Sequence, residues 1–177
     1  MMLIENIGKY PRYTELRNFV LDFYAEHDLH NSGQYALQGK DENDGQYCCM
    51  RRKFGGTFTG HDDRTHSTLL KIFENTEIQT LFEWLTDYTV CRSRIFVLGQ
   101  GNKSEYGIHR DPTKRLHVPI VTNNTCGFNF YTDDHEHRLT EQLEADGSVY
   151  IVDTTVLHNT QNTHSDDRIH IVCSYYD

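Results

Sequence analysis

Residues 115–131 read RLHVPIVTNNTCGFNFY, in which two runs rich in β-branched and aromatic residues flank the turn-forming segment NNTCG. More runs of this kind lie on both sides of it, and turns containing Gly, Asn or Asp separate them. Many short strands at such spacing predict an antiparallel sandwich or barrel. The other runs are RIFVLG (94–99), YGIH (106–109), HRLTEQL (137–143), SVYIVD (148–153) and RIHIVCSYY (168–176).

The first 90 residues differ, because their apolar residues recur at helical spacing. The segment TELRNFVLDFYAEH (14–27) has Thr14 as a candidate N-cap, followed by an apolar stripe. Two further helices are predicted for STLLKIFEN (67–75) and for TEIQTLFEWLTDY, which begins at Thr76. Residues 31–66 contain too many turn formers for long regular elements. We expect the helices to pack their apolar stripes against one sheet.

Length and composition indicate one domain over residues 1–177, with 1–90 as a helical, loop-rich support and lid region and 91–177 as the β core carrying the site. The formal net charge of −9 argues against a nucleic-acid backbone as the main partner. Five cysteines without a C-x-x-C pair are typical of reduced thiols in an intracellular protein. No run approaches the ~18 apolar residues of a membrane helix, so we expect a cytoplasmic protein.

A candidate metal site begins in the segment HRDPTKRLH (109–117). Residues two apart on a strand point to the same side, so His109 and Asp111 could approach one metal ion while Arg110 faces away. His158 is the best candidate for a third ligand, since antiparallel folding can bring it beside His109. Two histidines and one carboxylate leave coordination positions open, and this set favours Fe(II) in oxygen-activating enzymes.

Three basic residues are candidates for binding an anionic co-substrate. Arg168 lies on the last predicted strand, while Arg115 and His117 share one face of the strand predicted for 115–121. A guanidinium fork suits a carboxylate, and an arginine buried beside an iron site is costly without an anion. A dicarboxylate such as 2-oxoglutarate would supply that anion.

The ordered set of His-x-Asp, Arg-x-His, a distal His and an Arg ten residues later resembles the Fe(II)/2-oxoglutarate-dependent oxygenases. More narrowly, it resembles the branch containing aspartyl/asparaginyl β-hydroxylases and free-proline hydroxylases, on the text HRDPTKRLHVPIVTNN (109–124) and GSVYIVDTTVLHNTQNTHSDDRIHIV (147–172). The resemblance implies a mainly β fold, a cupin-like jelly roll or double-stranded β-helix, with N-terminal helices packed on one sheet. Animal-type aspartyl β-hydroxylases lack the carboxylate ligand, so Asp111 makes the free-proline hydroxylases the closer likeness.

The resemblance also implies the role of each matching residue. Arg168 matches the residue that holds the distal carboxylate of 2-oxoglutarate, and Asn162 matches a recurrent polar position. The residues that match iron ligands are His109, Asp111 and His158, and those that match a pair near the co-substrate are Arg115 and His117.

The implied function is that of a 2-oxoglutarate-dependent dioxygenase with Fe(II), 2-oxoglutarate and O2. It would hydroxylate an unactivated C–H bond of a small amino acid or an amino-acid side chain and release succinate and CO2. The implied partner is therefore a small-molecule or peptide substrate, with neither nucleic acid nor membrane, and nothing in the sequence points to a particular oligomeric state. A non-oxygenase, cupin-like metal-binding protein is the alternative, and it would have no reason to hold Arg168 inside the barrel near the metal.

Several polar segments allow two interpretations. HDDRTH (61–66) and TDDHEH (132–137) could each bind a metal, but both lie in hydrophilic, turn-rich stretches, which favours solvated loops. The basic segment MRRKFGG (50–56) is either a substrate contact or a solvated turn, and the second is favoured. His170 shares the predicted face of Arg168 and is either a residue that supports the site from behind or a satisfied barrel histidine, and the second is favoured.

Overall fold

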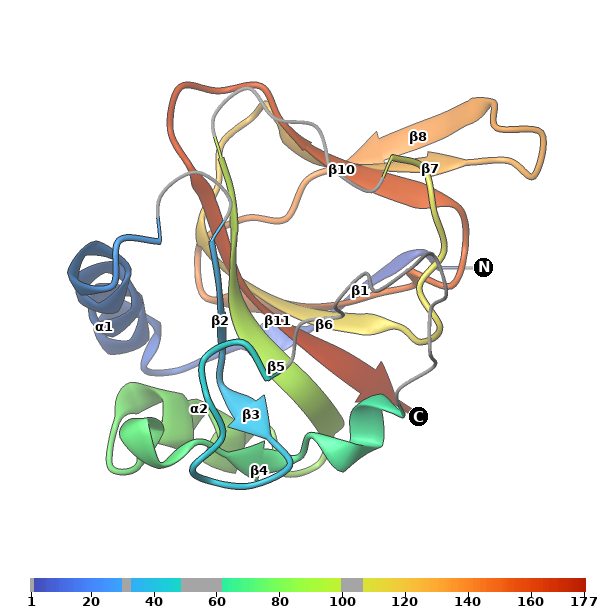
Figure 1. The fold of residues 1–177 in the computed structure, drawn as a ribbon. Coiled ribbons are helices and arrows are strands. Elements are labelled where there is room, and N and C mark those ends of the chain that lie inside the picture. Colours follow the sequence, from blue (N-terminus) through green and yellow to red (C-terminus); the bar gives the residue numbers. More distant parts are fainter. Residues whose placement is uncertain (1, 30–32, 49–61, 100–106) are drawn as a thin grey trace.

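The computed structural model describes residues 2–29, 33–48, 62–99 and 107–177. Two antiparallel sheets lie face to face (Figure 1), so the predicted mainly β jelly roll is confirmed. The 6-stranded sheet has the order β1 (Ile4–Lys9), β9 (Ser148–Val152), β6 (Arg115–Val121), β11 (Arg168–Tyr176), β5 (Thr89–Leu98) and β2 (Gln34–Ala36). The 3-stranded sheet has the order β10 (His158–Asn162), β7 (Cys126–Tyr131) and β8 (His137–Glu141), and β3 (Gln38–Gly39) pairs with β4 (Thr68–Leu69).

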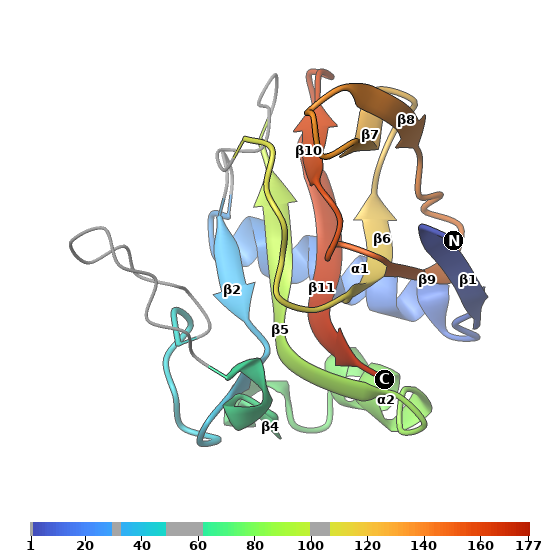
Figure 2. The same ribbon diagram turned by 90° about the vertical axis from the view of Figure 1, so that its right-hand side faces the viewer.

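Helices cover the outer face of the 6-stranded sheet, as expected. Helix α1 (Tyr13–Glu26) runs behind the sheet in Figure 2, and α2 (Glu77–Trp84) lies near the C-terminal end of β11. Each helix contributes an apolar stripe to one core cluster that also contains sheet residues such as Ile95, Val118 and Ile171. Two short 3-10 helices, η1 (Asp63–Thr65) and η2 (Lys71–Phe73), connect the remaining segments.

The helix predictions met with different outcomes. Thr76 caps α2, because its side chain accepts a hydrogen bond from the backbone N–H of Ile78. Thr14 is not an N-cap: it lies inside α1, which begins at Tyr13 without a side-chain cap. The predicted helix over 67–75 is wrong, since this segment forms β4 and η2. Leu70 and Phe73 of this segment are buried, but Ile72 is exposed.

The strand predictions agree closely for β6 and β11, whose observed bounds equal the predicted runs. The run YGIH forms no strand in its described part, where His109 makes an isolated bridge to His158. Five of the described strands were not predicted: β1 to β4 lie in the N-terminal half, and β10 has the polar sequence HNTQN. The polar sequence of β10 has no apolar alternation that could be detected, and the strand forms because it pairs with β7.

Strands β6 and β11 are buried on both faces, and the two faces differ in chemistry. One face is apolar and packs under the helices, with Leu116, Val118 and Ile120 from β6 in the main core. The other face points toward the small sheet and carries polar residues that are nevertheless buried. They are Arg115, His117, Arg168, His170 and Ser174. The fold therefore encloses charge, which needs partners or ligands.

Candidate metal centre and anion pocket

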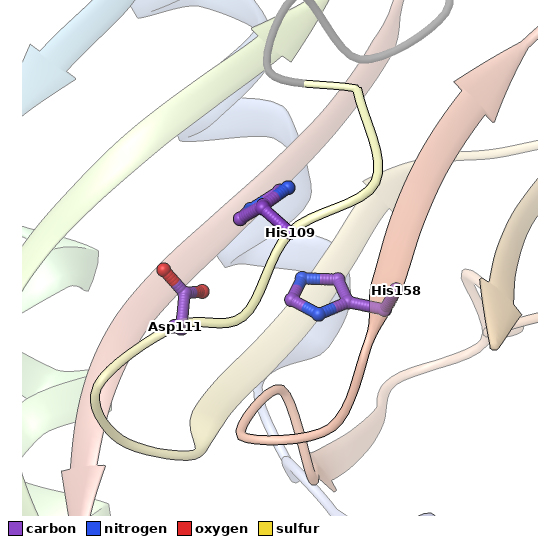
Figure 3. Close-up of side chains that lie close together, drawn as sticks. All are labelled: His109, Asp111 and His158. Carbon is purple, nitrogen blue, oxygen red and sulfur yellow. The ribbon is translucent and has the colours of Figure 1, made fainter. Parts of the chain in front are cut away.

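The three candidate metal ligands converge. The ligand atoms of His109, Asp111 and His158 all lie within 4.8 Å of one another (Figure 3). The backbones of His109 and His158 exchange two hydrogen bonds, of 3.0 and 2.9 Å, which place the two rings side by side. The Asp111 backbone N–H donates to the carbonyl of Thr154 at 2.8 Å. The segment 109–111 is thus fastened to the β9–β10 connection, which fixes the position of all three side chains.

Hydrogen bonds also orient the two imidazoles. His109 Nδ1 lies 3.1 Å from the carbonyl oxygen of Gly107, and His158 Nδ1 lies 3.0 Å from that of Val156. A carbonyl only accepts, so each Nδ1 carries the proton and each Nε2 keeps its lone pair for a metal. Burial lowers the pKa of His158 below its usual value, which favours the neutral form that ligation requires.

The carboxylate ligand is held by an arginine. Arg115 donates to both oxygens of Asp111, through Nε at 3.0 Å and Nη2 at 3.1 Å. Burial alone would raise the pKa of Asp111, but the charge and hydrogen bonds of Arg115 outweigh it and hold the pKa well below the usual value. Asp111 is therefore ionised and oriented before any metal binds.

Arg168 is a buried cation, and no carboxylate in the described part of the chain forms an ion pair with it. Only 2% of its surface is exposed. Its partners among the described residues are His170 Nδ1, 3.1 Å from Nη2, and the ring of Phe128, whose centroid is 5.4 Å from Cζ. Burial lowers the pKa of Arg168 to about 10. A buried guanidinium in this state favours an anion, so its surroundings fit a ligand carboxylate.

Two neutral histidines lie beside this arginine. Arg168 can only donate, so His170 Nδ1 is an acceptor. His117 Nδ1 lies 3.4 Å from His170 Nδ1 and is therefore the donor of that pair. Burial, and then the charge of Arg168, lowers the pKa of both imidazoles well below the usual value. Both Nε2 atoms are buried, and neither has a hydrogen-bond partner in the described part of the chain. His170 is thus not the fully satisfied barrel histidine that the sequence favours.

Phe128 connects the two halves of the site. Its ring centroid lies 5.0 Å from that of His117 and 6.3 Å from that of the metal-ligand candidate His158, while its face covers Arg168. A molecule that spans the metal position and Arg168 would pass along this ring. Phe128 is not among the site residues expected from the sequence, although its place in the β-rich run that follows NNTCG is a usable signal.

The remaining candidates have other positions. Arg115 contacts Asp111 and, from its Nη1, Asp63 at 3.1 Å. The buried amide of Asn162 donates to the carbonyls of Leu98 and Asp166, and so ties the end of β10 to neighbouring segments. Among the described residues, His109, Asp111 and His158 are the one set with metal-ligand geometry. The cluster at 132–137 is exposed, whereas Asp63 and His66 of the other cluster are buried; His61 and residues 50–56 lie outside the described residues.

The donor set fits iron. Two imidazoles and one carboxylate grouped on one side leave the other coordination positions open, which is the arrangement of non-haem Fe(II) oxygenases. Arg168, which has no carboxylate partner among the described residues, fits the far carboxylate of a dicarboxylate co-substrate. Both ends of the site therefore suit the cofactors that the sequence implies.

Comparison with known proteins agrees with this geometry. Residues 78–177 match the family model of aspartyl/asparaginyl beta-hydroxylase. No protein of curated function matches the chain in sequence. The structure is similar to IDO from Bacillus thuringiensis, with a TM-score of 0.57 and 12% identity over 98% of this chain and 93% of that chain.

Two further solved structures share the fold at low identity. An oxidoreductase of the 2OG-Fe(II) oxygenase family from Burkholderia pseudomallei has a TM-score of 0.50 and 12% identity, over 90% of this chain and 76% of that chain. AviO1 from Streptomyces viridochromogenes Tue57 has a TM-score of 0.50 and 13% identity, over 98% of this chain and 89% of that one. In the described part of the chain, neither helix has the length and apolar character needed to span a membrane.

Proposed function

The chain belongs to the aspartyl/asparaginyl beta-hydroxylase family, and from that premise we propose that it hydroxylates an unactivated C–H bond of a small amino acid or an amino-acid side chain, releasing succinate and CO2. Family membership makes it a hydroxylase of the 2OG-Fe(II) oxygenase type. It therefore favours the enzyme over a cupin-like protein that binds metal for another purpose. The family description, which names aspartyl and asparaginyl side chains, supports this substrate class.

In this proposal His109, Asp111 and His158 hold the iron, and Arg168 pairs with the distal carboxylate of 2-oxoglutarate. Bound together with O2, iron and 2-oxoglutarate supply the oxidising power for C–H hydroxylation. The protein supplies binding and orientation. In the neutral ring, the Gly107 and Val156 carbonyls hold the proton on Nδ1 and so direct Nε2 of each histidine ligand to the metal, while Arg115 keeps Asp111 ionised.

The pocket residues would bind the co-substrate and exclude water. Phe128 covers the Arg168 guanidinium, so the ion pair with an incoming carboxylate would form away from solvent, where it is strongest. His117 lies between Phe128 and His170, beside the route from the metal position to Arg168. We therefore assign His117 to the wall of the co-substrate pocket, as the sequence expects. Arg115 has most of its donors on Asp111, Asp63 and Ser174, so we assign it to Asp111 rather than to direct co-substrate binding.

The observation that carries the proposal is the buried Arg168, without a carboxylate among the described residues, beside Phe128, whose ring also lies near His158 of a two-histidine, one-carboxylate cluster. The test is anaerobic titration with Fe(II) and then 2-oxoglutarate. We expect a weak visible charge-transfer band that needs both additions. With O2, free amino acids and short Asp- or Asn-containing peptides should be screened for succinate and for a product carrying one added oxygen atom.

Arg168→Ala should weaken 2-oxoglutarate binding while leaving metal affinity largely intact. An absent charge-transfer band in folded protein, or an Arg168→Ala variant with unchanged affinity for 2-oxoglutarate, would contradict the proposal. Turnover of a substrate of another class would keep the oxygenase and remove the amino-acid assignment.

A further inference from the structure

Asp63 lies in the segment HDDRTH, for which the sequence favours a solvated loop, yet only 1% of its surface is exposed. Its Oδ2 accepts from Ser174 Oγ at 2.7 Å and from Arg115 Nη1 at 3.1 Å. Nη1 of Arg92 lies 3.6 Å from the same oxygen. A carboxylate so buried is costly unless several donors compensate it, and here two arginines and a hydroxyl do so.

These contacts lead directly to the metal centre. The Arg115 guanidinium divides its donors: Nε and Nη2 bind the two oxygens of Asp111, while Nη1 binds Asp63 and Ser174. Asp63, Arg115 and Asp111 therefore form one continuous chain of charge-assisted hydrogen bonds. A β-bulge in β5 supports its outer end, since Arg92 has a φ of 50° and its N–H donates to His66 at 2.7 Å.

We propose that Asp63 and Ser174 are positioning residues of the metal centre. They fix the Arg115 guanidinium, which in turn fixes the Asp111 carboxylate in the orientation that a metal ligand needs. An aspartate χ2 is otherwise a broad torsion, so an Asp111 held by both oxygens gives up freedom before metal binding rather than during it. A carboxylate has about four lone-pair sites, so the two bonds from Arg115 leave others for the metal.

This inference rests on the proposed metal site, and a metal-binding measurement tests it. Metal-free protein is titrated with Co²⁺ and Mn²⁺ by calorimetry, and the ligand-field spectrum of the Co²⁺ form is recorded. For Asp63→Asn we expect affinity to fall about 10- to 100-fold, as for other partners of metal ligands, with an altered Co²⁺ spectrum. Ser174→Ala should cause a smaller loss in the same direction. The affinity for 2-oxoglutarate at saturating metal should change little.

Asp62→Asn is the matched control. Asp62 has the same charge and lies in the same turn, but it is exposed and its carboxylate binds Arg64. We expect it to leave metal affinity and the Co²⁺ spectrum unchanged. The thermal unfolding midpoint of each metal-free variant shows whether a loss of metal affinity is accompanied by a loss of stability. If Asp63→Asn does not fold, the metal affinity of Ser174→Ala, which removes a single hydroxyl, tests the inference instead.

A double-mutant cycle tests whether Asp63 acts through Arg115. Arg115→Lys keeps the positive charge but removes the fork that holds both Asp111 oxygens. In that background Asp63→Asn should reduce metal affinity little further, whereas additive losses would contradict the chain of contacts. If the wild type binds metal and the folded Asp63 and Ser174 variants show the same affinity and Co²⁺ spectrum, this inference is overturned and the proposed function is not. A wild-type protein that binds no divalent metal would overturn the proposed function as well.

Discussion

Arg115 and Arg168 lie on neighbouring strands of the same sheet, both with 2% of their surface exposed, but Arg115 is paired with two carboxylates and Arg168 with His170. The two buried arginines therefore have different roles. The paired guanidinium is part of the folded protein's own charge balance. The other guanidinium remains available for a ligand, at the cost of stability in the ligand-free protein.

Replacing these two arginines should therefore change stability in opposite directions. Arg168→Met removes a buried cation that lacks an anion, so the free energy of unfolding should stay the same or rise by about 1–4 kcal/mol. Arg115→Met leaves the buried Asp63 and the half-buried Asp111 each short of a partner and should lower it by about 3–5 kcal/mol. Urea unfolding of the ligand-free protein measures both. A large destabilisation by Arg168→Met would mean that its charge is already compensated in the folded protein.

Metal binding should weaken as the pH falls below about 6, because protons compete for the two histidine ligands. Asp111 should not contribute to this dependence, since Arg115 holds its pKa well below the usual value. Asp111→Asn should thus reduce Co²⁺ affinity at every pH while the slope of affinity against pH stays as in the wild type. Calorimetric titrations from pH 5 to 8 compare the two slopes. A shallower slope in the variant would show that Asp111 takes up a proton in this range.

The ligand-free protein should lose stability when the pH drops below about 6.5. Burial lowers the pKa of His117 and His170 well below that of an unfolded histidine, so the unfolded chain binds more protons and the folded state is disfavoured as pH falls. For each such histidine the free energy of unfolding should fall by about 1.4 kcal/mol per pH unit below the unfolded pKa. Above that pKa this loss is absent.

His170→Phe should therefore flatten the dependence of unfolding free energy on pH by about one proton. The exposed His135, changed to Asn, is the control for removing one histidine. Denaturant unfolding at pH 5.5, 6.5 and 7.5 gives the slopes. Equal slopes in the wild type and His170→Phe would mean that His170 does not stay neutral in the folded protein.

Phe128 should matter for the co-substrate and little for the metal. Its ring covers Arg168 at 5.4 Å, and a cation–π contact of this kind contributes about 0.5–2 kcal/mol. Phe128→Leu should therefore weaken 2-oxoglutarate binding several-fold and leave Co²⁺ affinity near that of the wild type. Phe130→Leu on the same strand controls for a general loss of packing. Similar losses in both variants would assign the effect to packing rather than to Arg168.

Local sequence patterns predicted the helices and strands whose own residues carry a clear apolar periodicity. Alternation and flanking turns gave the bounds of β6 and β11, and the cap and stripe after Thr76 gave α2. Pattern failed where pairing decides the structure: β10 is polar throughout and exists because β7 binds it. The helix expected over 67–75 failed because Leu70 and Phe73 reach the core from a segment folded as a short strand and a tight turn.

The sequence by itself determined an antiparallel β fold and the candidate ligands, because strand periodicity and the chemistry of His, Asp and Arg are local properties, and the resemblance to the oxygenases specified the jelly roll. The tertiary structure alone decided which polar residues share an enclosed space. Asp62 and Asp63 are adjacent and chemically identical, yet one is solvated and the other is buried against Arg115. Burial and charge pairing depend on segments far apart in the chain, such as Asp63 and Ser174, and no local pattern contains that information.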